Sequence, residues 1–289
     1  MRTFFIILAL ITTAVLWLAT FLSVHVWIFE LIADGALYLI ALLVVFIFIL
    51  AVYCAWRVVI AFGGVLLLYV FFFIFPITLS STEVKNIPPN PDLFFMNTLF
   101  WNDDMQPMSD AIVALQPKAV GLVEVNANLL NKVKKEYGEP LVYHDDEGLS
   151  CAIFSKQKVA KSFIVHKEYP ICIAEFADYA LIVVHPAPPY TKQLWKVQQA
   201  YFANVQSLAA DYQAKNMPVI IAGDMNSTWF SKTLRNPLGK FKVRSFLSWW
   251  ANSSVALPID HIVPVGKKIQ KTYMLPHMSS DHRGLVAFF

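Results

Sequence analysis

The first quarter of the chain is almost uninterrupted apolar sequence. From residue 4 to residue 78 the only formally charged side chains are Glu30, Asp34 and Arg57. A membrane-spanning helix needs about 20 mostly apolar residues. Runs long enough for such helices occupy residues 4–28, 36–56 and 58–77.

A cleaved signal peptide is the alternative for the first of these runs. Its apolar part is, however, longer than the roughly 7–15 residues of a signal core, and two further runs follow it. We therefore expect residues 1–79 to form an all-α membrane anchor of about three transmembrane helices. A polar, proline-rich stretch at residues 80–91 is typical of a short, extended tether.

Short apolar runs and amphipathic segments alternate over residues 92–289, a length that supports one sizeable core. Helical spacing predicts helices at residues 110–115, 127–137 and 191–212. Closely spaced runs predict an antiparallel meander at residues 149–154, 161–166, 171–176 and 180–185. Further buried strands are expected at residues 93–96, 119–123, 218–222, 260–263 and 285–289.

Composition supports the division into an apolar front and a globular remainder. The hydrophobic content of 57% exceeds the roughly half that is usual for soluble domains. Without the four charged residues of the apolar front, Arg2 included, the chain keeps 21 basic and 18 acidic residues. A balance this close to neutral is not the electrostatic footprint of a duplex-DNA binder, although it leaves room for a local basic patch.

The few charges of the anchor suggest its orientation. With three spans, Arg2 and Arg57 fall on one side of the membrane, and Glu30 and Asp34 fall on the other. Positive charge favours the cytoplasmic side. We therefore expect the N-terminus in the cytoplasm and residues 92–289 outside the cytoplasmic membrane.

The three cysteines fall into two groups. Cys54 lies in an expected span, where cysteine is usually a small buried hydrophobe. Cys151 and Cys172 lie on neighbouring expected strands, and a disulfide between them is possible in an oxidising compartment.

Acid, amide and histidine side chains follow several apolar runs in a fixed order. The motifs are Phe-Phe-Met-Asn97, Gly-Leu-Val-Glu124, Val-Val-His185-Pro, Gly-Asp224-Met-Asn226, Pro-Ile-Asp260-His261 and Ser-Ser-Asp281-His282. This ordered set resembles the endonuclease/exonuclease/phosphatase superfamily, with its DNase-I-like fold. The resemblance implies an α+β fold with two packed mixed β-sheets flanked by helices, a four-layer sandwich, here preceded by the all-α transmembrane segment.

The resemblance also implies a divalent-metal site. Glu124 is the first candidate ligand, although Val123 stands where the family usually has glutamine. Asn97 would contact the metal shell or a phosphate oxygen, and Asp281 would complete the site. Alone, Glu124 reads as a strand-end surface glutamate and Asn97 as the opening of a turn. Mg²⁺ is the expected ion because it prefers oxygen ligands, and Mn²⁺ or Ca²⁺ are alternatives.

The Asp224 and Asn226 pair is the sharpest single motif. Two residues apart in an extended segment, their side chains point to the same side. Asp224 would activate or orient the attacking water, and Asn226 would donate to the phosphoryl oxygens as charge develops. An Asx turn after a strand is the structural alternative.

Histidines complete the candidate catalytic set. By the resemblance, Asp260 fixes the tautomer of His282 and raises its pKa, so that the imidazole serves as general acid or electrostatic stabiliser. His185 matches the phosphate-binding histidine of the family. His261 points to the opposite face of its strand, which favours a structural role. Many members also carry an arginine or tyrosine that touches phosphate, and residues 171–179 offer no arginine for it.

These features predict a membrane-anchored, metal-dependent phosphoesterase that hydrolyses phosphodiester or phosphomonoester bonds. Nucleic acid and phospholipid or its head group are both substrate classes of the superfamily, and a short tether to the bilayer mildly favours the lipid. A catalytically silent scaffold of the same fold is the alternative. A transport role for the apolar segment is weaker, because no expected span carries an unpaired charge deep in its middle.

Overall fold

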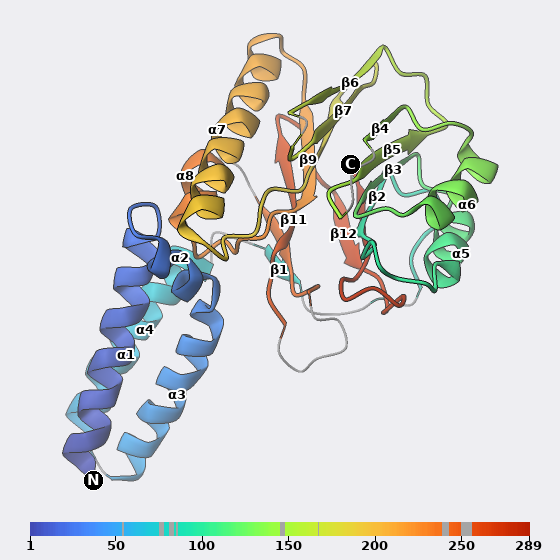
Figure 1. The fold of residues 1–289 in the computed structure, drawn as a ribbon. Coiled ribbons are helices and arrows are strands. Elements are labelled where there is room, and N and C mark those ends of the chain that lie inside the picture. The colour runs from blue at the N-terminus through green and yellow to red at the C-terminus, as the bar shows by residue number, and fades with distance from the viewer. Residues whose placement is uncertain are drawn as a thin grey trace.

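The computed structural model describes residues 1–53, 55–74, 78–80, 84, 86–144, 148–166, 168–238, 243–249 and 256–289. Within these residues a slender helical bundle is joined at one end to a broad α/β sandwich (Figure 1). Cys54 and part of the expected tether, residues 81–83 and 85, lie outside the described residues.

The bundle consists of apolar helices from the front of the chain. They are α1 (Arg2–Leu22), α2 (Trp27–Asp34), α3 (Ala36–Val52) and α4 (Trp56–Tyr69), which a π-helical turn, η1 (Val70–Ile74), extends. Two of the described helical stretches, Arg2–Leu22 and Trp56–Ile74, are long and apolar enough to cross a membrane, and the pair α2 and α3, bent by 65°, would make a third if it counts as one span. The outward faces of the bundle are apolar, with Phe48, Ile60 and Leu67 about 70% exposed.

The expected first span of residues 4–28 is wrong at its end. Helix α1 stops at Leu22, and Trp27 and Ile28 already belong to α2, which turns toward the sandwich (Figure 1). Helix α2 turns away because it carries Glu30, which is fully buried and requires polar partners that lipid does not offer. Those partners come from the sandwich.

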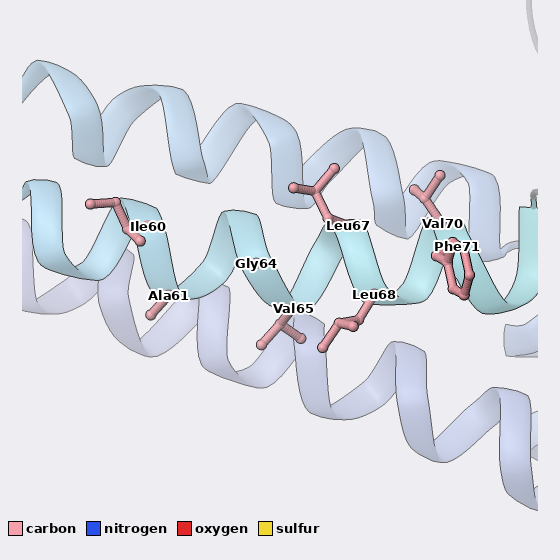
Figure 2. A pocket seen from close by; sticks show the side chains of 8 residues that line it. All are labelled: Ile60, Ala61, Gly64, Val65, Leu67, Leu68, Val70 and Phe71. Carbon is pink, nitrogen blue, oxygen red and sulfur yellow. The ribbon is translucent and has the colours of Figure 1, made fainter.

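Helix α4 carries a shallow apolar groove on its outer face (Figure 2). Ile60, Gly64, Leu67, Leu68 and Phe71 are among its lining residues. The groove contains no titratable side chain and belongs to the same outward apolar surface as the rest of the bundle.

The sandwich contains two mixed sheets. One has the strand order β1-β10-β11-β9-β8-β7-β6, and the other has the order β12-β13-β2-β3-β5-β4. The strands of the first sheet are β1 (Thr78–Ser80), β10 (Arg244–Phe246), β11 (Asp260–Val265), β9 (Val219–Asp224), β8 (Ala180–Val184), β7 (Ile171–Glu175) and β6 (Lys161–Val165). Those of the second are β12 (Lys271–Met274), β13 (Leu285–Phe288), β2 (Leu93–Asn97), β3 (Ala119–Val123), β5 (Cys151–Ser155) and β4 (Val142–His144).

Helices cover the outer face of each sheet, which confirms the predicted four-layer α+β sandwich. Helices α7 (Lys192–Ala214) and α8 (Lys232–Leu238) pack on the first sheet, and α5 (Gln106–Leu115) and α6 (Ala127–Tyr137) pack on the second (Figure 1). Between the sheets lies a core of strand side chains such as Phe95, Val183 and Ile220. Alternate strand residues therefore enter different apolar layers.

The expected four-strand meander is only partly correct. Strands β6, β7 and β8 do follow one another as antiparallel neighbours, but β5 pairs with β3 and β4 in the other sheet. The chain crosses between the sheets after β5, and spacing alone cannot distinguish this crossing from a hairpin. Cys151 and Cys172 consequently lie on facing sheets, and a disulfide joins them across the core.

Helix α2 fixes the bundle to the sandwich through two acidic side chains, of which Glu30 is fully buried and Asp34 is half-buried. The Glu30 carboxylate accepts hydrogen bonds from the hydroxyls of Ser231 (2.6 Å) and Thr233 (2.7 Å). Asp34 accepts from the backbone N–H of Thr228 at 2.7 Å. Because these acidic side chains find polar partners on the sandwich in place of water, this contact is a specific attachment.

Candidate functional site

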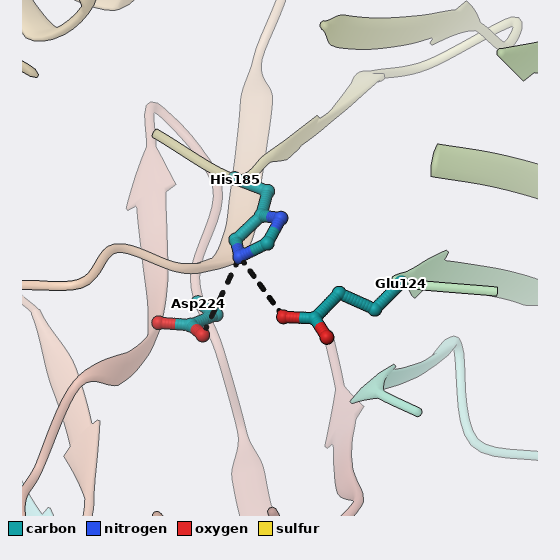
Figure 3. A group of neighbouring side chains, drawn as sticks. All are labelled: Glu124, His185 and Asp224. Carbon is teal, nitrogen blue, oxygen red and sulfur yellow. Dashed lines mark ion pairs between the residues drawn. The ribbon is translucent and has the colours of Figure 1, made fainter. Parts of the chain in front are cut away.

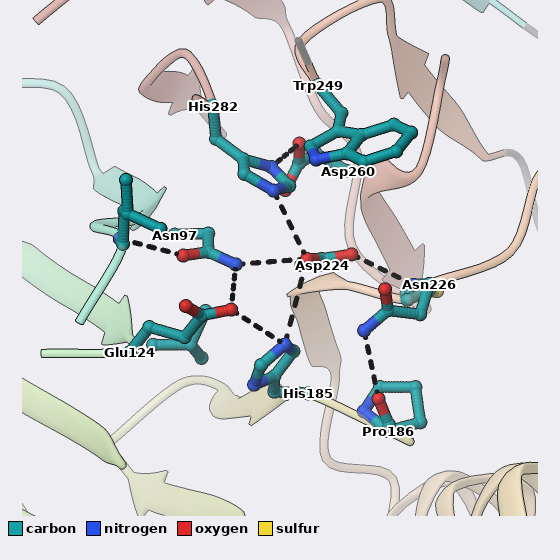
Figure 4. A network of polar contacts seen from close by, with 12 residues as sticks. Asn97, Glu124, His185, Pro186, Asp224, Asn226, Trp249, Asp260 and His282 are labelled. Carbon is teal, nitrogen blue, oxygen red and sulfur yellow. Dashed lines mark hydrogen bonds and ion pairs between the residues drawn. The ribbon is translucent and has the colours of Figure 1, made fainter. Parts of the chain in front are cut away.

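The ends of two pairs of parallel strands bring the predicted site residues together. Strand β2 pairs in parallel with β3, so Asn97 and Glu124 emerge at the same end of one sheet. In the other sheet β8 pairs in parallel with β9, which delivers His185 beside Asp224. Both ends meet at one rim of the sandwich (Figure 4).

Two carboxylates of the first sheet face each other across a strand pair. Asp224 on β9 is the direct partner of Asp260 on the antiparallel strand β11. Opposed like charges are unfavourable, and His282 relieves them: its Nδ1 donates to Asp260 at 2.7 Å, and its Nε2 lies 3.5 Å from Asp224. The predicted pairing of Asp260 with His282 is therefore present.

The imidazole of His282 is a buried cation at neutral pH. Burial alone would lower its pKa, but the charges of Asp260 and Asp224 and the hydrogen bond to Asp260 raise the pKa of His282 to about 10. Ser248 also donates a hydrogen bond to Asp260. The dyad formed by Asp260 and His282 is thus also stabilised by the Ser248 hydroxyl.

Asp224 is the centre of the polar network. Its Oδ2 accepts from Asn97 Nδ2 at 3.0 Å and lies 3.7 Å from His185 Nε2, and its Oδ1 accepts from the backbone N–H of Asn226 at 2.9 Å. Burial raises the pKa of Asp224, partly against the attraction of His282. A buried carboxylate with a raised pKa is a stronger base than an exposed one.

Glu124, His185 and Asp224 form a possible metal centre (Figure 3). Their ligand atoms all lie within 4.8 Å of one another, and His185 Nε2 is 3.4 Å from Glu124 Oε1. Glu124, Asp224 and Asp260 are three carboxylates around the imidazolium of His282, which leaves net negative charge in a largely buried space. The carboxylate oxygens of Glu124 and Asp224 are hard donors that suit a divalent cation, and His185 adds one nitrogen donor, so these residues fit such an ion.

Asn97 presents its amide nitrogen to the carboxylates in this arrangement. Its Oδ1 accepts from the backbone N–H of Leu99 at 3.0 Å, which turns Nδ2 toward Glu124 (2.8 Å) and Asp224. Here Asn97 bridges the two acids and offers them hydrogen bonds. Contact between the Asn97 side-chain oxygen and a metal would require the amide to rotate.

Asp281 lies at the margin of the site. Its Oδ2 accepts from the indole Nε1 of Trp249 at 3.2 Å, and among the described residues it is outside the clusters whose ligand atoms lie within 4.8 Å of one another. Trp249 lies over the dyad, with its ring centroid 6.5 Å from that of His282. Its indole therefore contacts both Asp281 and the pair formed by Asp260 and His282.

The backbone after β9 turns sharply to present Asn226. This residue has a positive φ of 46°, which asparagine tolerates better than most side chains. One N–H of its amide donates to the Pro186 carbonyl at 3.0 Å, and the nitrogen carries a second hydrogen. The residue before Asp224 is a glycine, Gly223, because β8 approaches it closely: a Cβ at this position would lie 2.3 Å from the Val184 carbonyl oxygen.

His261 supports the same turn from behind the sheet. Its Nε2 donates to the Ser227 carbonyl, and its Nδ1 accepts from the Ser245 hydroxyl, each at 2.9 Å. Burial lowers the pKa of His261 to about 4, so the ring is neutral. Its orientation away from the site agrees with the structural role expected for it.

Several supporting residues have no motif of their own in the sequence. The buried Tyr201 hydroxyl accepts from the backbone N–H of His185, and Gln198 donates to the Asn226 carbonyl. Both lie on α7, where they read as ordinary positions of an amphipathic helix. Ser280, which donates to the Asn97 carbonyl, was signalled only by its place beside Asp281.

The chain belongs to the endonuclease/exonuclease/phosphatase family, whose pattern matches residues 94–282. A comparison with curated proteins finds no match. The fold resembles that of truncated TDP2 from Caenorhabditis elegans, with 15% identity, a TM-score of 0.51, and coverage of 68% of this chain and 97% of that one.

Two other solved structures share the fold. The 3′ phosphatase NExo from Neisseria, bound to a product DNA hairpin, has 12% identity and a TM-score of 0.53, over 68% of this chain and 98% of that one. An AP endonuclease from Archaeoglobus fulgidus has 12% identity and a TM-score of 0.52, with the same coverage of each chain. At these identities the likeness defines the fold alone.

Proposed function

We propose that this protein is a membrane-anchored, divalent-metal-dependent phosphoesterase. One observation carries the proposal: the strand ends of both sheets converge on Asp224, which contacts Asn97, His185 and His282 within a largely buried space. Membership of a family named for nucleases and phosphatases supports hydrolysis of a phosphate ester.

A bound Mg²⁺, or alternatively Mn²⁺ or Ca²⁺, would be held by Glu124 with Asp224 and His185 nearby. When bound, such an ion neutralises phosphate charge and polarises the bond between phosphorus and oxygen. Asn97 would orient the two carboxylates, and Asp281 would act from the margin of the site.

The remaining residues supply acid, base and hydrogen bonds. Asp224 accepts a proton from water as the water oxygen bonds to phosphorus, and His282 donates a proton to the leaving oxygen as its bond to phosphorus breaks. The second N–H of Asn226 and the His185 imidazole stabilise the phosphoryl oxygens. Proton return from Asp224 to His282, 3.5 Å apart, restores the starting state.

We further propose that residues 1–79 anchor the enzyme in the cytoplasmic membrane through several spans, with residues 80–91 as tether and residues 92–289 as an extracytoplasmic catalytic domain. Arg2 and Arg57 lie at helix starts at the end of the bundle away from the sandwich, where the N-terminus is seen (Figure 1). The positive-inside rule favours the cytoplasm for that end. The disulfide between Cys151 and Cys172 supports an oxidising compartment for the sandwich.

The test uses the full chain in lipid nanodiscs, stripped of metal with EDTA. Hydrolysis of bis-4-nitrophenyl phosphate, 4-nitrophenyl phosphate, a DNA oligonucleotide and a phospholipid is measured with and without Mg²⁺, for the natural chain and for Asp224→Ala. We expect Mg²⁺-dependent turnover that Asp224→Ala lowers by about 10³-fold or more. Asp211→Ala, an exposed aspartate on α7, is the matched control.

A catalytically silent scaffold is the competing function. It predicts no turnover on any of these substrates and no Mg²⁺ binding by calorimetry. The retention of Asp224, Asn226 and the paired Asp260 and His282 favours the enzyme, because a silent scaffold has no need of a buried imidazolium between two acids.

A further inference from the structure

A cavity of about 220 Å³ adjoins the candidate site at the junction between bundle and sandwich. Asn226 and Trp249, which belong to the site, line one side of it. Leu31 on α2, Tyr38 on α3 and Gly35 between the two helices also line it, so the bundle contributes to its wall. The cavity therefore lies between the candidate site and the end of the bundle that is joined to the sandwich.

The walls of this cavity are fixed by the bundle. The indole of Trp27 donates to the Pro189 carbonyl at 2.6 Å, which holds the loop after β8 against α2. The Tyr38 hydroxyl donates to the Ala256 carbonyl at 2.9 Å, beside Leu257 of the lining. Together with the hydrogen bond from the Thr228 N–H to Asp34, these contacts between bundle and sandwich fix the shape of the cavity. The cavity therefore depends on both parts of the chain.

The lining is mostly apolar and carries one acidic side chain among the described residues. Pro188, Pro189, Leu257 and Ile259 offer no side-chain hydrogen bonds, Asp34 supplies the carboxyl, and the described lining residues include no lysine or arginine. A nucleic acid would bring neighbouring phosphates, which need cations rather than an aspartate. An alkyl chain needs only apolar walls. A ligand with such a chain in the cavity can place its phosphate in the candidate site.

Tyr190 also lines the cavity, next to Pro188 and Pro189 in the chain and beside Asn226 in the lining. Its side chain is 67% exposed. Tyr190 and Asn226 therefore supply polar groups where the cavity meets the site, which is where the boundary between the tail and the head of an amphiphile would fall.

We propose that the substrate is a phosphate ester of a long-chain, membrane-embedded amphiphile. Its phosphate occupies the site around Asp224 and Asn226, and the first carbons of its chain enter the cavity between Leu31, Pro188 and Leu257. The proposal rests on the phosphoesterase function proposed above and specifies its substrate class. The chain then continues along the apolar surface of the bundle into the bilayer.

The first experiment compares two diesters with the same leaving group, octadecyl 4-nitrophenyl phosphate and methyl 4-nitrophenyl phosphate, with the full chain in nanodiscs. We expect the octadecyl ester to have the higher kcat/KM. Leu31→Trp, which fills the cavity, should lower the octadecyl-to-methyl ratio by about tenfold or more, because apolar contact with the chain is lost. Ile28→Trp, on the same helix but outside the lining, should leave the ratio unchanged.

The second experiment does not depend on turnover or on a variant. An octadecyl phosphonate with a photoreactive diazirine near its head group is crosslinked to the natural chain in nanodiscs, and the labelled peptides are mapped. Labelling of peptides with Leu31, Pro188 or Leu257, absent with the corresponding phosphorus-free alcohol, supports the proposal. Labelling confined to the outer faces of α1, α3 and α4 overturns it.

The two experiments separate the possible failures. Equal kcat/KM for both diesters, or a ratio that Leu31→Trp leaves intact, overturns the amphiphile while the phosphoesterase stands. A DNA oligonucleotide turned over with a higher kcat/KM than the octadecyl ester also overturns it, in favour of a nucleic acid. If neither diester is hydrolysed, the phosphoesterase fails, and the crosslinking result alone decides whether the cavity binds an amphiphile.

Discussion

At the scale of single residues, the site depends on how Asp260 and Asp224 share one imidazole. Both acids lie on neighbouring strands in direct register, and the His282 imidazole contacts both of them, which reduces their mutual repulsion. The pairing of the two strands therefore sets both acids beside His282 and favours its protonated form. Replacing either acid should lower the pKa of His282.

Replacement of Asp260 with asparagine should lower the pKa of His282 and weaken the proposed acid. We expect kcat to fall by about 10²–10⁴-fold, as for loss of a positioned proton donor. The natural chain keeps His282 protonated until pH approaches about 10, whereas the variant should lose the proposed activity at lower pH. A pH-rate profile of both proteins measures this. Asp178→Asn, on the exposed turn before β8, is the control, and an unchanged alkaline limb in Asp260→Asn would contradict the role.

The buried, neutral ring of His261 should make the free energy of unfolding fall in acid. Its pKa is about 4 in the folded chain and 6.5 when unperturbed, so the folded state favours the neutral ring. The stabilisation is complete above pH 6.5 and is lost as pH falls toward 4, by about 3 kcal/mol at most. Denaturation of the natural chain at several pH values measures the slope.

His261→Gln should abolish much of that slope, because glutamine does not titrate. His166→Gln, at an exposed position, serves as control and should keep the slope of the natural chain. If both variants show the same dependence on pH, another group is responsible.

At the scale of elements, the sequence predicted strands and helices wherever local periodicity was strong. The predicted helix at residues 127–137 agrees with α6, and the buried runs before Asn97, Glu124 and His185 are strands. Short elements were missed, namely β1, β4, β10, β12 and α8, which have three to seven residues and little room for a period. Their pairing depends on strands distant in sequence.

The candidate site was predictable as a set because most of its residues end or follow an apolar run, and Asp281 and His282 directly precede one. The geometry within the set was not predictable. That Asn97 turns its nitrogen to the acids depends on Leu99, and that Asp281 is held at the margin depends on Trp249. Neither contact has a signature in local sequence. The catalytic and metal-binding roles of these residues stay predictions.

Helix α2 should be required for activity as well as attachment. Asp34→Ala removes the acceptor of the Thr228 N–H, two residues after Asn226. We expect a loss of stability of about 1.5–3 kcal/mol and a fall in kcat, since the loop that positions Asn226 loses its support. Thermal denaturation and Mg²⁺-dependent turnover in nanodiscs measure the two effects. Asp110→Ala, at an exposed helix position, should change neither.

At the scale of the whole molecule, bundle and sandwich form one structure. Leu16, Tyr69 and Phe73 of the bundle share a buried cluster with Phe230 of the sandwich. The Arg235 guanidinium donates to the Thr20 carbonyl at 3.2 Å. A fragment without the bundle would expose this cluster, so the sandwich alone is a poor substitute for the full chain.

The disulfide predicts a response of the sandwich to reductant. Cys151 and Cys172 are 21 residues apart and join the two sheets. Its loss should lower stability by about 3 kcal/mol in the chain-entropy picture. The melting temperature of the full chain with and without dithiothreitol measures the effect, and the Cys151→Ala, Cys172→Ala double variant should not respond. Free thiols at both positions in protein from native membranes would contradict an oxidising location.

The burial of Glu30 constrains the order in which the molecule is made. Its partners, Ser231 and Thr233, are synthesised some two hundred residues after it. In the membrane-anchored arrangement that we propose, α2 would have no surface that satisfies its carboxylate when α1 enters the bilayer. The Glu30 carboxyl would stay in contact with water until the last strands have folded. The bundle would then reach its final form only after the sandwich does, and we expect a defect in the C-terminal half to show first as an incompletely packed bundle.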